Sequence, residues 1–193
     1  ERMKQTIAWN PPALLQSPLF TPLHPALERF AGAEFPSLSD WNRLLAGLQP
    51  AIRVHGGQAL RFVAQEHGRL DFEAQYEPRC YLKGEVQTRE NNWHDFFNGL
   101  VWLTFPQAKA VINSRHYLAL TEPGRQSPNP TRDSQRGGVR DMATLFDESG
   151  VIIACAATEL ADLLRAFKWK ELFWQHRART CCAMDFYLFG HGL

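Results

Sequence analysis

The sequence predicts an α+β fold in a single domain, in which a helical core contains a central antiparallel helix hairpin beside a small antiparallel sheet. The first reason is length, since 193 residues suffice for one domain with a sizeable core. The second is composition, because 45% apolar and 12% aromatic residues are typical of a globular chain. The third is pattern: stretches with helical spacing of apolar residues alternate with short strand-like stretches, and no internal repeat is visible.

Residues 1–36 are predicted to form a proline-rich N-terminal arm, and residues 37–193 the α+β domain. Prolines interrupt regular elements, so the arm should hold only a short helix at residues 25–30, with Pro25 in its first turn. The domain should then open with a helix at residues 40–48, for which Ser39 is the expected N-cap.

Short extended segments are expected next. The Gly56-Gly57 pair marks a turn, and residues 60–65 are predicted to form a strand. Residues 70–76 and 79–82 fit either a strand or irregular structure. Residues 86–89 are expected to connect this region to the centre of the fold.

The centre of the fold is expected between residues 93 and 116. Apolar residues have helical spacing over 93–103, and a second helix is predicted over 106–116, because its proline suits a first turn. A connection of two or three residues favours an antiparallel pair. Each helix is roughly 15 Å long, so folding back should bring four polar side chains into one recess: His94, Asn98, Asn113 and His116.

The chain after the second helix is expected to begin with a long mobile loop. Residues 122–138 contain almost nothing apolar, and they carry a local positive cluster of Arg125, Arg132 and Arg136. Residues 142–156 are then predicted to form a β-hairpin, in which Asp147-Glu148-Ser149-Gly150 is ordinary turn chemistry, although the two acids also resemble a metal-binding pair.

The C-terminal part should contain two more helical segments and a strand. Thr158 is the expected cap of a helix over 159–167. Residues 169–177 are predicted to be helical, and three of their side chains should face inward: Trp169, Leu172 and Phe173. Residues 182–189 have strand character, and Gly190-His191-Gly192 follows them.

Charge and cysteine content narrow the classes of partner and location. The net charge is +1, so no global field attracts nucleic acid or an acidic membrane; nucleic acid is a possible partner that is not favoured. The four cysteines show no C-x-x-C spacing, which gives no zinc-ribbon or redox motif. Free thiols favour a cytoplasmic location. No apolar run is long enough to span a bilayer, so no membrane partner is expected, and the oligomeric state stays open.

Two histidines are the first candidates for chemistry. His94 and His116 suit either the binding of one divalent metal, such as zinc or magnesium, or a general base and its partner. The alternative is two structural histidines near helix ends. Asp95 could orient the His94 imidazole as a catalytic carboxylate, or it could stabilise the first helical turn.

The other candidates are residues that could bind a substrate. Asn98 and Asn113 interrupt apolar helical patterns, so each amide must bond either a ligand or the other helix. Arg89 and Arg140 suit carboxylate or phosphate groups, and Asp141 adjoins the second arginine; structural ion pairs are the alternative. His191, between two glycines, could close over a site or belong to a frayed terminus.

Several of these motifs together resemble an uncharacterised bacterial family, domain of unknown function 3025. The matching motifs are Thr88-Arg89, Asn92-Trp93-His94-Asp95, Phe97-Asn98, Leu100-Val101-Trp102, Phe105-Pro106, Asn113-x-x-His116, Arg140-Asp141, Phe146-Asp147-Glu148 and Gly190-His191. The resemblance covers roughly residues 35–193 and implies a bacterial origin. It implies no activity, so the chemistry has to come from the residues.

A second likeness concerns residues 98–116. Asn98-x-Leu100-x-Trp102-x-Thr104, followed by Asn113 and His116, is similar to the tail of the His-Asn-His, or ββα-metal, nuclease motif. That resemblance implies that His94 activates water and that His116 binds a divalent ion. The sequence departs from the motif because only a short helical stretch separates His94 from Asn98.

Three hypotheses follow for function. The first is an enzyme of the hydrolase type, with His94, Asp95 and His116 in catalysis or metal binding and Arg140 on an anionic group. The second is a non-catalytic module that binds a small anion under the arginine-rich loop. The third is a structural network of buried polar side chains without a ligand. The first two predict a small anionic ligand or substrate.

Overall fold

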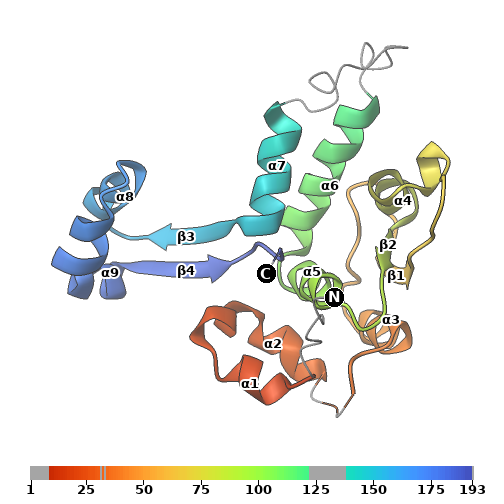
Figure 1. Ribbon diagram of the computed structural model, residues 1–193, viewed down its shortest axis with the longest axis horizontal. Helices are drawn as coiled ribbons and strands as arrows, with labels where there is room; N and C mark the ends of the chain where they lie inside the picture. The colour runs from red at the N-terminus through yellow and green to blue at the C-terminus, as the bar shows by residue number, and fades with distance from the viewer. Residues whose placement is uncertain (1–8, 31, 33, 122–137, 193) are drawn as a thin grey trace, which may run out of the picture.

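The computed structural model describes residues 9–30, 32, 34–121 and 138–192, and it describes residues 138–140 by their backbone alone. Helices dominate, and the strands form two separate two-stranded sheets, one parallel and one antiparallel (Figure 1). The α+β class and the small antiparallel sheet are therefore confirmed. The predicted loop at residues 122–138, with Arg125, Arg132 and Arg136, lies outside the described residues except for the backbone of Gly138, which begins a helix.

Helix α5, Trp93–Thr104, is the centre of the fold, as predicted. Its residues from Asp95 to Trp102 are all buried, which is the behaviour of a helix enclosed on every side. Asn92 caps it, because its side chain accepts the backbone N–H of Asp95. Asp95 and Asn98 are thus fixed on a rigid, buried element.

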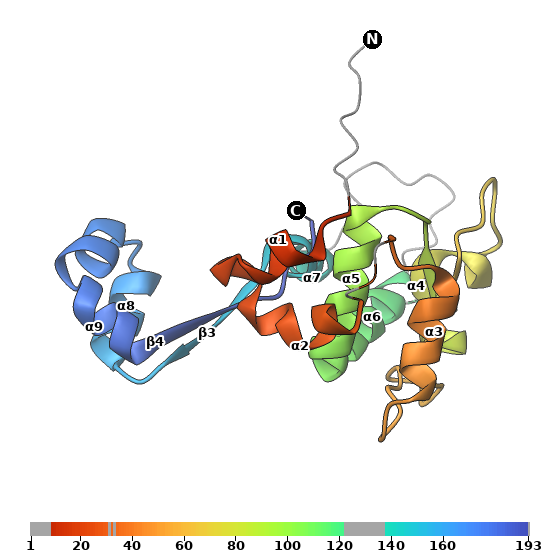
Figure 2. The same cartoon turned by 90° about the horizontal axis from the view of Figure 1, so that it is seen from below.

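The N-terminal segments cover one side of α5 (Figure 2). They are α1 (Pro11–Leu15), η1 (Pro18–Leu23), α2 (His24–Leu27) and η2 (Glu28–Phe30). Leu23, Leu27 and Phe30 belong to the main core. The short helix predicted at residues 25–30 is confirmed by α2 and η2.

Helix α3, Leu38–Ala46, brings Trp41 into the same core, where this side chain is 2% exposed. The helix is confirmed, but its predicted cap is two residues late. Ser37, not Ser39, is the N-cap, and it forms a reciprocal capping box with Asp40.

Strands β1 (Arg61–Ala64) and β2 (Glu85–Thr88) pair in parallel across a helical crossover. The crossover contains η3 (Phe72–Ala74) and α4 (Tyr76–Lys83), so the strand alternative for residues 70–76 and 79–82 is wrong. Gly84 ends α4 with a φ of 71°, a conformation that glycine adopts readily. This turn sends β2 directly towards the start of α5.

Helix α6, Pro106–Thr121, begins after a single connecting residue, Phe105. The Phe105 N–H bonds to Val101, and the Phe105 carbonyl accepts the Lys109 N–H, so the chain turns a corner without losing its hydrogen bonds. The two helices therefore meet at a steep angle (Figures 1 and 2). Both helices are confirmed, but the antiparallel arrangement expected for them is wrong, because one residue is too short a loop for a hairpin.

Helix α7, Gly138–Ser149, replaces the first strand of the β-hairpin predicted over residues 142–156, which is wrong. Gly150 follows this helix, and its N–H bonds to the carbonyl of Phe146, as at a helix C-terminus. Strand β3, Val151–Cys155, then pairs with the distant antiparallel strand β4, Met184–Leu188.

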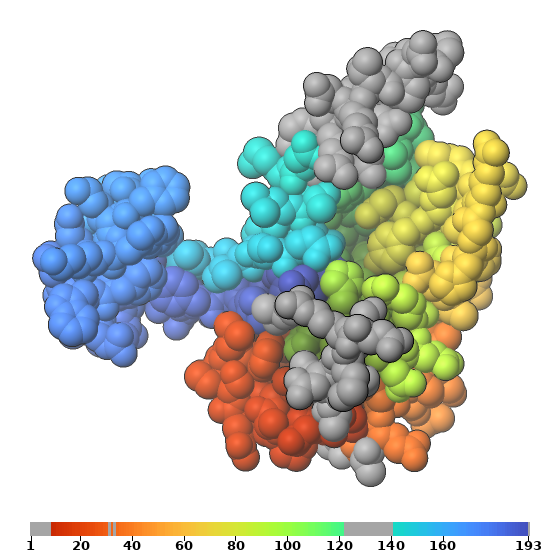
Figure 3. All heavy atoms as spheres, viewed as in Figure 1, coloured from red at the N-terminus to blue at the C-terminus, as the bar shows by residue number. Residues whose placement is uncertain are grey.

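Strands β3 and β4 form the stalk of an arm that projects from the body (Figures 1 and 3). Its tip contains α8 (Thr158–Arg165), the π-helical turn η4 (Glu171–Gln175) and α9 (Arg177–Ala183). A small separate core of Leu160, Leu172 and Met184 holds this tip together. The arm is thus an outlying unit with its own packing.

Several details of the arm differ from expectation. Thr158 is the first helical residue and not a cap. Leu172 is buried as predicted, but Trp169 and Phe173 are 49% and 41% exposed, because the tip is too small to cover them. The four cysteines are free. Within the residues that the structure describes, no helix is long and apolar enough to cross a membrane.

Candidate active site

A polar cavity of about 310 Å³ lies between the first half of α5 and α6, and residues of α4, α7, β2 and the C-terminal segment complete its lining. Its volume is near the lower end of the range for small-molecule sites. Every lining residue has a polar side chain: Gln65, Tyr76, Glu77, Gln87, Arg89, His94, Asp95, Asn98, His116, Thr144, Asp147, Glu148 and His191. Such a concentration of polar groups beside the core is costly unless the groups are paired or bind a ligand.

Arg89, Asp95 and His94 form a chain of contacts at one edge of the cavity. The Arg89 guanidinium donates to both carboxylate oxygens of Asp95, at 2.9 and 2.7 Å, and the Arg89 backbone N–H adds a third bond of 2.7 Å. Although burial alone would raise it, these bonds lower the pKa of Asp95. Asp95 therefore stays ionised and faces Nδ1 of His94 at 3.0 Å.

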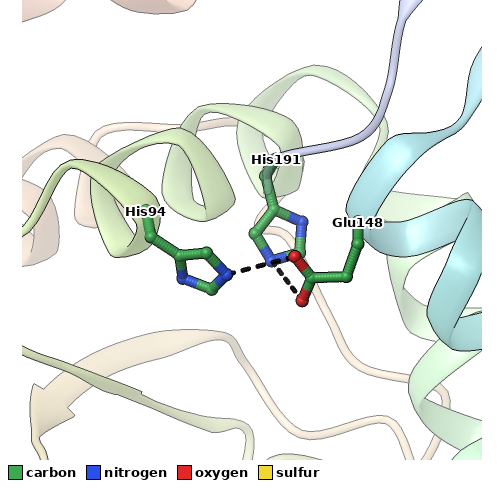
Figure 4. A group of neighbouring side chains, drawn as sticks. All are labelled: His94, Glu148 and His191. Atoms are coloured by element: carbon green, nitrogen blue, oxygen red, sulfur yellow. Dashed lines mark hydrogen bonds and ion pairs between the residues drawn. The ribbon is translucent and has the colours of Figure 1, made fainter. Parts of the chain in front are cut away.

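His94, His191 and Glu148 point towards one another (Figure 4). The side chains of His94 and Glu148 are 39% and 40% exposed, so this group lies at the mouth of the cavity. The three side chains come from α5, the C-terminal segment and α7, and each offers one ligand atom within 4.8 Å of the others. The His94 Nε2 lies 3.4 Å and the His191 Nε2 4.0 Å from Glu148 carboxylate oxygens. Burial, with the nearby charge of Lys109, lowers the pKa of His191 to about 4, so its imidazole is neutral at pH 7.

Asp147 lies behind His191 and is held by a buried lysine. The Lys109 ammonium, on α6, donates to both Asp147 oxygens at 2.6 and 2.9 Å. Asp147 Oδ1 is 4.0 Å from Nδ1 of His191, and that nitrogen has no hydrogen-bond partner among the described residues. Each histidine at the mouth thus has an aspartate on its Nδ1 side, and each aspartate pairs with a cation.

The carboxyl group of Glu77, on α4, is held in the cavity by Asn113, on α6. Asn113 donates to the carboxylate of Glu77 at 2.6 Å and to its backbone carbonyl at 3.1 Å. Burial raises the pKa of Glu77, against the opposing effects of His116, the Asn113 bond and Lys109. Glu77 therefore keeps its proton to a higher pH than an exposed glutamate does.

Asn98, in the middle of α5, also lines the cavity. Its Nδ2 donates to the Tyr76 hydroxyl at 2.8 Å. Its buried Oδ1 has no hydrogen-bond partner within the described part of the chain, although the residue lines the cavity. A buried acceptor in that position calls for water or a ligand group.

The structure brings together most of the residues predicted for a site. His94, Asp95, His116, Asn98, Arg89 and His191 all line the cavity. Asn113 lies just behind it, on Glu77. Asp141 is exposed and does not line the cavity. The side chain of Arg140 lies outside the described residues.

The sequence interpretation missed seven of the thirteen lining residues, and four of these seven carry a carboxyl or phenol group. Asp147 and Glu148 had been assigned to a turn, yet they end α7; the signal was Gly150, which follows a helix as well as it follows a turn. Tyr76 and Glu77 begin α4, and Pro78 in a first turn followed by Gly84 at the end is a recognisable helix signature. His116 is not a member of the three-residue ligand group, where His191 and Glu148 accompany His94.

A larger hollow, of about 790 Å³, lies over residues 29–44. Its Asp40 and Arg43 pair with each other at the surface, and Asp40 is committed to capping α3. Its lining contains no histidine or cysteine, and the group of metal-ligating side chains found among the described residues lies in the polar cavity instead, so the polar cavity is the candidate site.

The chain belongs to the family described as protein of unknown function (DUF3025), whose model matches residues 60–193. The match includes every residue that lines the polar cavity. No curated protein and no solved structure matches the chain. The likeness to ββα-metal nucleases carries no further argument, because residues 93–104 form a helix where that motif has strands.

Proposed function

We propose that the polar cavity is the active site of an enzyme of the hydrolase type that acts on a small polar substrate. The observation that carries the proposal is the meeting of His94, Glu148 and His191 at the mouth of a cavity lined by polar side chains alone. Nitrogen and oxygen acceptors that face one another across a few ångströms can hold and activate a water molecule.

The remaining requirement of hydrolysis is a proton donor for the leaving group. Glu77 supports this role, because burial raises its pKa and Asn113 holds its carboxyl group in place. His116 lies in the same cavity and interacts electrostatically with Glu77. In acid–base catalysis, one group in a cavity donates a proton and another group in the same cavity accepts one.

The unpartnered Oδ1 of Asn98 supports a substrate with a hydrogen-bond donor at the cavity wall.

That the substrate also carries an anionic group is a more specific expectation. Among the described residues, the cations beside the cavity are Arg89 and Lys109, and both are paired with aspartates. A bound anion therefore needs a positive charge from another source. Free thiols at all four cysteines support a cytoplasmic location as part of the same proposal.

The proposal is tested by assaying the purified chain against chromogenic carboxylic esters, phosphate esters and amides, each with and without added Zn²⁺. Glu77→Gln, which keeps the shape but not the acid, should reduce the turnover of any accepted class by about 100-fold or more. Glu73→Gln is the matched control, because Glu73 is an exposed glutamate close to α4 that does not line the cavity. Saturable binding of such compounds without turnover would favour the alternative, a binding module.

A further inference from the structure

We infer that His94, Glu148 and His191 form a binding site for a divalent transition metal, with Zn²⁺ as the ion that fits the donors best. The inference deepens the proposed function, since the ion would lie in the cavity assigned to hydrolysis. It stands on geometry that does not depend on any reaction.

The donor atoms are close enough for one ion. They lie within 4.8 Å of one another, and the two contacts to Glu148 are 3.4 and 4.0 Å. Tetrahedral zinc holds nitrogen and oxygen ligands at about 2.0–2.2 Å, so neighbouring donors are roughly 3.3–3.5 Å apart. Binding therefore requires a small inward shift of Glu148, whose side chain is 40% exposed, and a closer approach of the two imidazole rings.

The groups behind the histidines orient both rings for metal binding. Nδ1 of His94 contacts Asp95 at 3.0 Å, and Nδ1 of His191 faces Asp147 at 4.0 Å. In both rings the other nitrogen, Nε2, is the one that points at Glu148. A carboxylate behind each ligating histidine is the usual arrangement around metal ions in proteins, because it fixes the tautomer and increases the basicity of the ligand.

A second, independent observation is the state of His191. This side chain is 3% exposed, and its Nδ1 has no hydrogen-bond partner within the part of the chain that the structure describes. A buried ring nitrogen without a partner is costly. A metal bond at Nε2 would place the ring proton on Nδ1, on the side of Asp147.

The type and number of ligands select among ions. Two imidazoles and one carboxylate suit zinc and its transition-metal neighbours, whereas Mg²⁺ and Ca²⁺ prefer oxygen ligands. Three protein ligands leave a coordination position for water or substrate, as in catalytic sites. A bound dication would also supply the positive charge that an anionic substrate requires in this cavity.

The test is metal binding by the full chain, measured without any activity assay. The purified protein is stripped with a chelator, loaded with Zn²⁺ or Mg²⁺, dialysed and analysed for bound metal. We expect one Zn²⁺ per chain, no retained Mg²⁺, and a Co²⁺ derivative with visible absorption bands. Glu148→Gln, which keeps the side-chain shape, should abolish stoichiometric binding, as should His94→Ala and His191→Ala. His55→Ala, at an exposed turn, should bind as the unaltered chain does.

Failure of the unaltered chain to retain Zn²⁺ would overturn the inference. Zn²⁺ retained equally by the Glu148→Gln protein would also overturn it, and loss of that binding in Cys181→Ser and Cys182→Ser would assign the ion to exposed thiols instead. A chain that binds Zn²⁺ through the three residues and hydrolyses nothing would leave the metal site intact and refute only the hydrolase proposal.

Discussion

At the residue scale, the ionised carboxylate of Asp95 links the buried helix α5 to the His94 imidazole of the candidate site. The carboxylate accepts three bonds from Arg89 and contacts His94. In the proposed site it would act as a positioning residue, since it contacts the His94 imidazole on the side away from Glu148.

Asp95→Asn should weaken Zn²⁺ binding by about 10–100-fold, the usual effect of removing a carboxylate behind a metal-bound histidine. Isothermal titration of the metal-free chain with Zn²⁺ measures this change. The Co²⁺ derivative of the variant should keep its bands, because the three ligands are unchanged. The control is Asp141→Asn, at an exposed position of α7. Equal Zn²⁺ affinities of the two variants would contradict the positioning role of Asp95.

A second residue-scale prediction concerns pH and Glu85 at the start of β2. Burial alone would raise the pKa of Glu85, but Arg79 and Arg61 donate to the carboxylate and lower it below the ordinary value of 4.5. A carboxyl group with a lowered pKa in the folded state contributes stability above its unfolded pKa. That contribution is lost as the pH falls below 4.5 and through the folded value.

Glu85→Gln should lower the free energy of unfolding by about 1–2 kcal/mol at pH 7, because two hydrogen bonds lose their charge. The difference from the unaltered chain should shrink as the pH falls from about 6 to about 3. Urea unfolding at a series of pH values measures it. A difference that stayed constant over this range would show that the carboxylate charge contributes nothing to stability.

At the scale of elements, the packing of the Trp41 ring, from α3, against α5 depends on Gly99. A Cβ at this position would lie 2.5 Å from the Trp41 ring, and Trp41 is 2% exposed and packs on Phe96 and Phe62. Gly99→Ala should therefore destabilise the chain by about 1–3 kcal/mol through overpacking, despite the better helix propensity of alanine.

The comparison for Gly99→Ala is Gly47→Ala at the end of α3, where a Cβ would meet only ordinary contacts of 3.5 Å and beyond. Thermal unfolding of both variants gives the measurement. Equal or greater stability of the Gly99→Ala chain would mean that Trp41 can move without cost, and it would contradict the packing described for the core.

The elements also show where sequence patterns were sufficient. The helices at α5 and α6 follow from apolar spacing and from Pro106, which begins α6, and β1 follows from its run of strand-forming residues. The failures arise where two local patterns look alike. Acidic residues followed by glycine end a helix in α7 but are equally common in a hairpin turn.

The candidate site was predictable where neighbouring helices supply its residues. His94, Asn98 and His116 do line one cavity. Helices α5 and α6 cross steeply (Figures 1 and 2), but two crossing helices can border a cavity as an antiparallel pair can. His191 was predicted as a candidate for a site, but neither it nor Glu148 could be placed beside His94. Their positions depend on the pairing of β3 with β4, whose partners such as Val151 and Leu188 are far apart in the sequence.

At the scale of the whole molecule, the two hydrophobic clusters divide the chain into a body and an arm tip. The cluster of Leu160, Leu172 and Met184 is small, while Trp174 and Phe167 at the tip are 77% and 72% exposed. Regions with few buried apolar contacts open at lower free energy than the core. The tip should therefore unfold locally without the body.

Leu172→Ala should destabilise the arm tip by about 2–5 kcal/mol, as expected for a large buried side chain. In hydrogen-exchange mass spectrometry, peptides from residues 158–183 should exchange faster in the variant, whereas peptides from α5 should be unchanged. An equal rise in exchange in α5 would mean that the arm and body unfold as one cooperative unit.

The route of β4 has a consequence for the cavity. The strand returns the chain from the tip to the body, where Phe189 joins the main core and His191 reaches the mouth of the cavity. His191 thus follows a strand whose other end lies at the arm tip, where the hydrophobic core is small. A molecule that bound the arm tip would therefore restrict the movement of β4. Through β4 it would also restrict the His191 imidazole, about one strand length away.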